Sequence, residues 1–195
     1  MSTERDEEEV YFKALEIEQR RKLRAKLEQA AKDMADKEAI AQSVKTDDLS
    51  LAERIKALGF SGDTAKVFDL LPLVHVAWAD GSIHKNERAA ILRVLELRGI
   101  PAGSEGFTLV ESLLEERPSD AYMSQSLAVL KELLASSGDE QRKREIVELS
   151  EQVAAAAGGF LGLGAKISDE ERKLIASISE QLGEGAAAGF REQLD

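Results

Sequence analysis

Residues 79–88 read ADGSIHKNER, and residues 164–172 read GAKISDEER. Aligned on Ile83 and Ile167, the two stretches match at a constant shift of 84 residues. At this shift three further pairs agree, namely Glu87 with Glu171, Arg88 with Arg172, and Ile91 with Ile175. We interpret the match as two copies of one helical unit, in which a loop delivers a glutamate into the first turn of a helix.

The composition favours helix along the whole chain. The 195 residues are rich in Ala, Leu, Glu, Lys and Arg, contain only 3 prolines, and are 43% apolar. Strong helix formers dominate, and no run shows the Val/Ile/Thr alternation that is typical of a strand. We therefore expect an all-α protein, whose length fits one domain with an appendage or two small domains.

The charge and the residue inventory argue against several functions. The formal net charge of −11 repels phosphate backbones, so we expect no nucleic-acid partner. The chain has no cysteine, which rules out a disulfide, a thiolate zinc site and a cysteine nucleophile. The first residues lack the apolar core of a signal peptide, and no apolar run approaches the roughly 20 residues of a membrane span. We expect a cytoplasmic protein.

Residues 1–46 form a segment apart, which we expect to be a charged N-terminal helical arm. Neither glycine nor proline occurs before residue 59, and an acidic start precedes a basic block at residues 20–26. The apolar stripe is thin and is interrupted by Gln19; it comprises Phe12, Leu15, Leu23, Leu27, Ala30 and Met34. Sustained heptads are absent. Two interpretations remain: a solvated, partly frayed helix, or an arm that binds a partner.

The compact part is expected to span residues 47–195. Ser50 and Glu53 have the spacing of a capping box, which predicts the start of a short helix ending at Gly59. Residues 64–79 are almost entirely apolar, which predicts a helix at the centre of a bundle, with Pro72 kinking or splitting it. The other predicted helices cover residues 85–98, 104–116, 119–136, 139–157, 169–182 and 186–194.

The matched turns offer the only candidate chemistry. Asp80, Gly81, Ile83 and Glu87 have the spacing of the second half of an EF-hand calcium loop, but the first half is missing, so an ordinary EF-hand is ruled out. A structural explanation is also available, because a glutamate at the third helical position closes a capping box. Glu87 and Glu171 therefore either cap helices or bind an ion or a partner. The candidate metal ligands are Asp80, Glu87 and Glu171.

Other polar residues give no catalytic pattern. The Gly-rich loop at residues 158–166 lacks both the P-loop and the dinucleotide-binding spacing, and no strand precedes it. His75 lies in the most apolar segment, where a lone histidine is usually a satisfied core or groove residue, and Trp78 is most simply core. No nucleophile elbow or ordered triad occurs. We expect a protein that is not an enzyme.

The Ala-Asp-Gly-x-Ile-x-x-x-Glu turn within residues 70–100, followed by the segment GFLGLGAKIS at residues 159–168 before Glu170 and Glu171, resembles the tellurite-resistance TerB and TerB-like family. The resemblance covers about residues 50–185. It implies an all-α, single-domain fold of about seven helices with a pseudo-repeated core, in a bacterial stress protein linked to tellurite. It also implies metal binding by acidic residues equivalent to Asp80 and Glu87, and adaptor roles in membrane-associated complexes.

Two differences from the family limit what the resemblance implies for this chain. The second turn has Gly164-Ala165 where the first has Asp80-Gly81, so an acidic site would be asymmetric. The arm lies outside the family core. The leading hypothesis is a non-enzymatic stress-response adaptor that binds a protein partner, with the arm as one binding surface and peripheral association with a membrane complex through partners. The alternative is a divalent-cation binder or sensor that uses the acidic turn residues, with that cation as the candidate cofactor.

Overall fold

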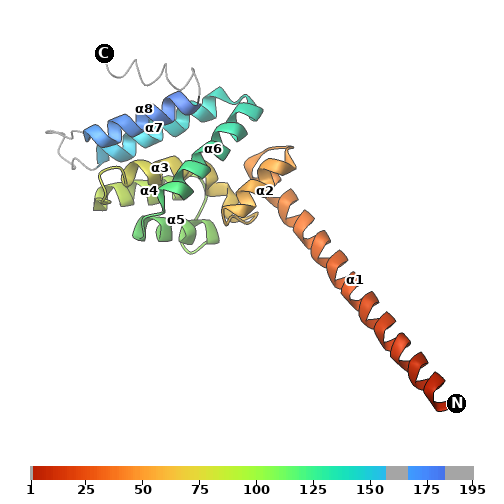
Figure 1. The fold of residues 1–195 in the computed structure, drawn as a ribbon. Helices are drawn as coiled ribbons and strands as arrows, with labels where there is room; N and C mark the ends of the chain where they lie inside the picture. The colour runs from red at the N-terminus through yellow and green to blue at the C-terminus, as the bar shows by residue number, and fades with distance from the viewer. Residues whose placement is uncertain (1, 157–166, 183–195) are drawn as a thin grey trace.

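A computed structural model describes residues 2–156 and 167–182, and every regular element in these ranges is helical, as the composition predicts. Figure 1 shows a helical bundle from which one long helix projects. The elements are α1 (Ser2–Val44), α2 (Leu49–Ala57), the 3₁₀ helix η1 (Thr64–Leu70), α3 (Leu71–Ala77), α4 (Lys85–Leu97), α5 (Glu105–Glu115), α6 (Asp120–Ser137), α7 (Glu140–Ala156) and α8 (Asp169–Leu182). The short helix expected at residues 186–194 lies outside the described residues.

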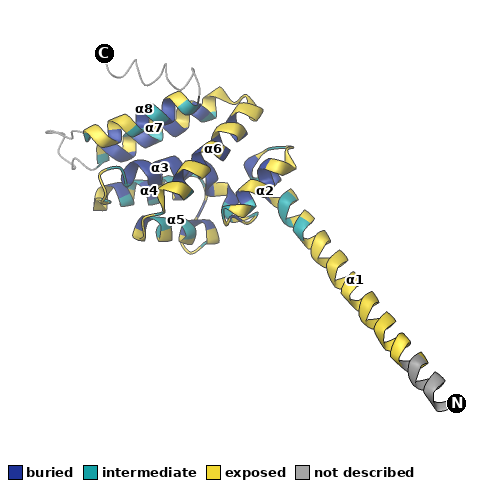
Figure 2. Ribbon diagram, in the orientation of Figure 1, coloured by how far each residue is buried: buried dark blue, intermediate teal, exposed yellow. Residues whose placement is uncertain are grey.

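Helix α1 is the projecting element, and it has two parts. Side chains from Tyr11 to Lys32 are all exposed, so this part of the helix does not pack against the other described residues (Figure 2). The last turns are different, because Ile40, Ala41 and Val44 are buried in the core. The expected boundary after residue 46 therefore lies beyond the exposed part of the helix, which ends near residue 36.

Helix α2 begins two residues earlier than a Ser50 cap would require, because Asp48 is its N-cap. The Asp48 side chain accepts hydrogen bonds from the backbone N–H groups of Ser50 (2.8 Å) and Leu51 (3.4 Å). Aspartate is among the best N-cap residues, and here it satisfies two of the backbone donors that every helix leaves open at its start. The predicted Ser50–Glu53 capping box is therefore wrong.

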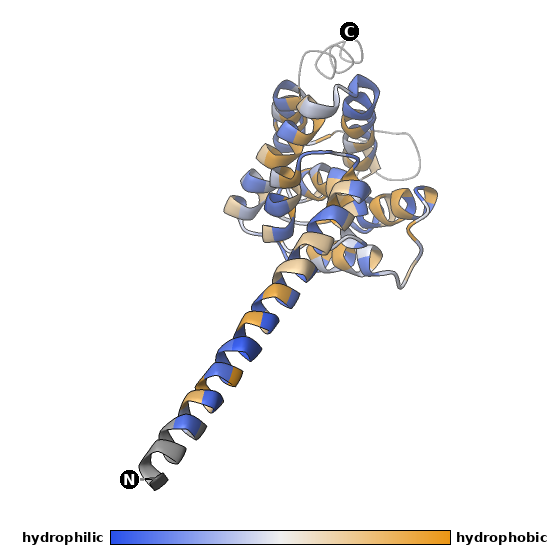
Figure 3. Ribbon diagram, turned by 90° about the vertical axis from the view of Figure 1, so that its right-hand side faces the viewer, coloured by the Kyte–Doolittle hydropathy of each residue, from blue (hydrophilic) through white to orange (hydrophobic). Residues whose placement is uncertain are grey.

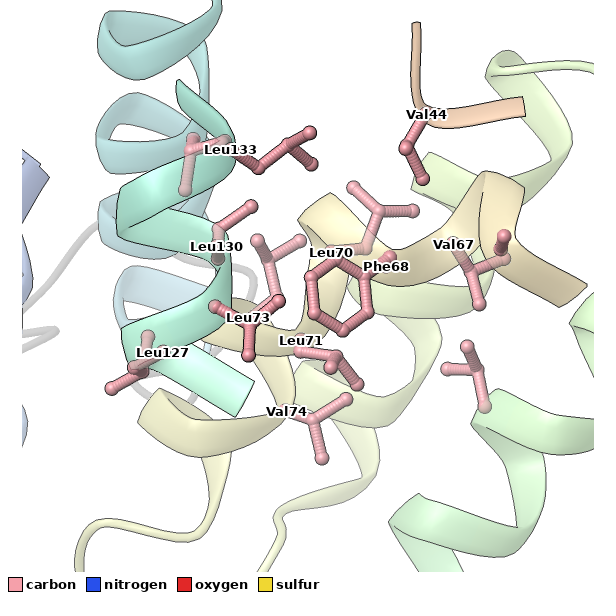
Figure 4. Packing of buried hydrophobic residues seen from close by; sticks show 14 of the residues in the cluster. Val44, Val67, Phe68, Leu70, Leu71, Leu73, Val74, Leu127, Leu130 and Leu133 are labelled. Atoms are coloured by element: carbon pink, nitrogen blue, oxygen red, sulfur yellow. The ribbon is translucent and has the colours of Figure 1, made fainter. Parts of the chain in front are cut away.

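The apolar segment at residues 64–79 forms the centre of the bundle, and it is split where Pro72 predicts. The 3₁₀ helix η1 ends at Leu70, and Pro72 lies in the first turn of α3, where its missing N–H costs no hydrogen bond. All seven residues of α3 are buried. In Figure 4, Leu127, Leu130 and Leu133 of α6 line one side of the cluster around Phe68, and Val44 reaches it from α1.

One buried carboxylate joins the chain segments around this core. Asp69 of η1 accepts hydrogen bonds from Arg98, just after α4 (3.0 Å), and from Arg142 of α7 (3.1 Å). Arg142 also donates to the backbone carbonyl of Val44 at the end of α1 (3.2 Å). A buried charge is tolerated only when it is paired and hydrogen-bonded, and Asp69 meets both conditions.

No described helix combines the length and the apolar character that crossing a membrane requires.

The two parts of α1 should respond differently to truncation of a side chain. Ile40 is fully buried, whereas Leu27 is 62% exposed on the same helix. We expect Ile40→Ala to lower the free energy of unfolding by about 2–4 kcal/mol, because it leaves a cavity in the core. Leu27→Ala should change it by less than about 0.5 kcal/mol. Urea unfolding of both variants checks this, and equal losses would contradict the assignment of only the last turns of α1 to the core.

Candidate functional site

The two matched turns cap their helices in the same way. The Glu87 carboxylate accepts a hydrogen bond from the backbone N–H of His84 (2.7 Å) at the start of α4. The Glu171 carboxylate accepts one from the backbone N–H of Ser168 (2.6 Å) at the start of α8, and the Ser168 hydroxyl accepts one from Glu171 (3.1 Å). The predicted capping role of both glutamates is confirmed.

The residues around the two glutamates also correspond. Ile83 and Ile167 both pack against the core, and Ile91 and Ile175 both lie within it. Gly81, with a φ of 91°, supplies the left-handed backbone of the first turn. Residues 164–166, the matching part of the second turn, lie outside the described residues, as does the rest of the Gly-rich loop. The comparison of the two units therefore covers Ile167 onward.

The structure brings the two capping glutamates together inside the protein. Glu87 is 1% exposed and Glu171 is 4% exposed. Burial, a hydrogen bond to Glu171 and the negative charges of Glu171 and Asp80 together raise the pKa of Glu87 from its usual 4.5 to about 8. The N–H of His84 opposes this shift. At neutral pH Glu87 is therefore protonated beside Glu171, since two buried carboxylates in contact do not both keep their charge.

Asp80 contributes to the electrostatics of this pair from its own turn. One of its oxygens accepts a hydrogen bond from the Ser82 N–H (2.9 Å), and the other lies 3.7 Å from Nε2 of His84. Its charge is one of the causes that raise the pKa of Glu87. Asp80 thus has a structural role that the sequence did not suggest, namely fixing the turn between α3 and α4.

The three predicted ligands do not form a ready-made metal cage. Within residues 2–156 and 167–182, no group of three or more His, Cys, Asp or Glu side chains is placed to hold a metal ion. The donor chemistry suits a hard cation, because carboxylate oxygens are its preferred ligands, but such a cation takes about six of them. Metal binding by Asp80, Glu87 and Glu171 stays a prediction.

The two remaining candidates, His75 and Trp78, line a cavity together. Trp78 donates from its indole nitrogen to the carbonyl of Leu113 (2.9 Å), which fits its expected core role. His75 borders a cavity of about 190 Å³ shared with Trp78, Arg117, Asp120, Met123, Ser124 and Leu174. Burial lowers the pKa of His75 to about 4, so the ring is neutral, and neither of its nitrogens bonds to a described protein group. It is a groove residue rather than a satisfied core histidine.

A second candidate surface lies on α1. Of the nine large apolar side chains that are strongly exposed in the described ranges, seven lie on this helix: Tyr11, Phe12, Leu15, Ile17, Leu23, Leu27 and Met34. At about 100° per residue, all of these except Tyr11 and Ile17 fall within about a third of the helix circumference. Figure 3 shows that hydrophobic residues alternate with hydrophilic ones along this helix. We call the set Phe12, Leu15, Leu23, Leu27 and Met34 the α1 stripe.

Comparisons with models of protein families, with curated proteins and with solved structures gave no match for this chain.

The proton held by Glu87 should make the stability of the protein depend on pH. Because the pKa is raised in the folded state, the contribution of this group is complete below about pH 4.5 and is lost as the pH rises through about 8. Glu87→Gln removes the titration and keeps a neutral group that can bond to Glu171. We expect its free energy of unfolding to exceed that of the wild type at pH 9 by about 1 kcal/mol or more, since one pKa unit corresponds to about 1.4 kcal/mol.

Urea unfolding between pH 5 and pH 9 measures this difference. Glu170→Gln is the matched control, because Glu170 is the exposed neighbour of Glu171 and its loss should leave the wild-type pH dependence in place. Parallel curves for Glu87→Gln and the wild type would show that the pair does not hold a proton.

Proposed function

We propose that this protein is a non-enzymatic helical adaptor that uses α1 to bind another protein chain. The observation that carries the proposal is the α1 stripe, which leaves several large apolar side chains in water on a helix that, from Tyr11 to Lys32, packs against no other described residue. Exposed apolar side chains that gather on one face of a helix are typical of interaction surfaces, and a projecting helix can present them to a partner as anchors.

The charges of α1 fit this role. Three ion pairs at i, i+4 spacing support the isolated helix: Glu9 with Lys13, Glu16 with Arg20, and Glu18 with Lys22. In each pair the glutamate precedes the basic residue, which is the more favourable order. The helix can therefore stay formed before a partner binds. Less conformational entropy is then lost on binding than if the segment had to fold at that moment.

We place this adaptor in a bacterial, cytoplasmic stress response of the tellurite-resistance type, as a TerB-like protein that reaches membrane-associated complexes through its partners. The support is the pair of motifs in order, together with the capping role that both motif glutamates share. The non-enzymatic assignment comes from the sequence, which has no nucleophile elbow and no ordered triad.

An affinity capture experiment tests the adaptor function. The full-length protein is immobilised and the bound proteins are identified by mass spectrometry. We expect the double change Leu23→Glu and Leu27→Glu to abolish specific capture, because it puts charge into the stripe. Ile17→Glu is the matched control: Ile17 is 66% exposed on α1 but points away from the stripe, so capture should persist. Equal capture by both variants would contradict a binding role for the stripe.

A divalent-cation site is the second candidate function, and the contact between Glu87 and Glu171 next to Asp80 favours it. A cation there would compensate the repulsion that otherwise keeps Glu87 protonated, so it must displace that proton. Water would supply the remaining oxygens, because the described residues offer too few.

Titration calorimetry with calcium, magnesium, manganese and zinc tests this site. We expect weaker binding at pH 6.5 than at pH 8.5, because the proton competes, and a loss of more than tenfold in Glu87→Gln, because an anionic oxygen is removed. Glu170→Gln should bind like the wild type. No heat and no thermal stabilisation with millimolar cations at pH 8.5 would rule the site out.

A further inference from the structure

We infer that the α1 stripe binds the same stripe of a second copy of this chain, with the two helices antiparallel and centred on Gln19. The inference rests on the proposed function in one respect, namely that α1 binds a protein chain. It identifies the bound chain as a second copy of this protein. Three independent features of α1 support it: the distribution of charge, the order of the apolar residues, and the length of the exposed helix.

The charge along α1 is divided into two halves of equal size and opposite sign. Residues 4–18 contain seven acidic and two basic side chains, a net charge of −5. Residues 20–32 contain six basic and one acidic side chain, a net charge of +5. A parallel pair would place like charges side by side, whereas an antiparallel pair places each acidic half along a basic half. Charge complementarity of this kind sets the orientation of paired helices.

The apolar residues of the stripe face one another in the same antiparallel register. With Gln19 opposite Gln19 of the second copy, Leu15 falls opposite Leu23, and Phe12 falls within one residue of Leu27. The order apolar, apolar, Gln, apolar, apolar thus reads alike in both directions, as a twofold symmetric interface requires. The central glutamine, which interrupts the stripe, would bond to its own copy and define the register.

The flanks of the stripe agree with this register as well. By the 100° spacing, Glu16 and Arg20 lie along one flank, and Glu18 and Lys22 lie along the other. Antiparallel pairing brings Glu16 near Arg20 of the second copy and Glu18 near Lys22 of the second copy. The ion pairs that these residues make within one helix are exposed, so they can rearrange at little cost.

The length of the exposed helix matches the proposed register. In this register residue 2 of one copy lies opposite residue 36 of the other, and residue 36 is where α1 enters its bundle. The two exposed arms therefore overlap along their whole length, about 50 Å at 1.5 Å per residue. The bundles lie at opposite ends of the paired arms, which form a bivalent adaptor (Figure 1 shows one half).

Sedimentation equilibrium of the full-length chain from micromolar to submillimolar concentration tests the inference. We expect a monomer–dimer equilibrium whose dissociation constant rises at least tenfold in Leu23→Glu and is unchanged in Ile17→Glu. Circular dichroism confirms that both variants keep the helix. A wild-type protein that stays monomeric over this range overturns the inference. If the wild-type protein is monomeric but the stripe is still needed to capture another protein, the adaptor function stands. If changes to the stripe also leave capture unaffected, both the dimer and the adaptor function are ruled out.

Charge exchange tests the ionic contacts between the two arms, and cross-linking tests their orientation. The double variants E16K/E18K and R20E/K22E should each dimerise more weakly than the wild type, and an equimolar mixture of the two should recover dimerisation. The chain has no cysteine, so Leu15→Cys and Leu23→Cys supply unique thiols. On oxidation, an equimolar mixture of the Leu15→Cys and Leu23→Cys variants should form the mixed disulfide between them. Disulfides within each variant alone would show a parallel pair and overturn the proposed register.

Discussion

The arrangement of the bundle depends on the ion pairs that the buried Asp69 carboxylate makes with two arginines. It lies within the core and meets the guanidinium groups of Arg98 and Arg142, and Arg142 reaches on to the carbonyl of Val44. Four segments thus meet around one buried charge. Loss of either arginine would leave that charge undercompensated, which costs more than the loss of a surface ion pair. The network also ties the base of α1 to the bundle, so the direction in which the helix projects follows from the core.

The helices could be predicted because their signals are local. Two of the predicted helices begin at Ser104 and Ser119, which are the N-caps of α5 and α6, and Pro72 separates η1 from α3. The start of α2 was predicted wrongly, because Asp48 and Ser50 are both good caps and the sequence alone does not decide between them. The Asp69 network joins residues 29 and 73 positions apart, and no local pattern reports such pairing.

The candidate site shows the same limit. The spacing of each turn predicted that Glu87 and Glu171 cap helices, and both do. Glu87 and Glu171 meet because α4 and α8 both pack against α3 and α7. The sequence of neither turn predicts that packing. The raised pKa of Glu87 is a property of the pair. A repeat in sequence can thus predict two equivalent parts while leaving open the property that arises where they meet.

Helix α1 is continuous from its exposed part into the buried turns at Ile40 and Val44. The azimuth of the stripe around the helix axis is therefore set by the core. One residue inserted between positions 36 and 40 would rotate the stripe relative to the bundle by about 100°, whereas four inserted residues would nearly restore its direction. The tolerance of α1 to insertions should thus vary with the helical repeat. The direction in which the stripe faces, rather than the length of the helix, is the property that must be preserved.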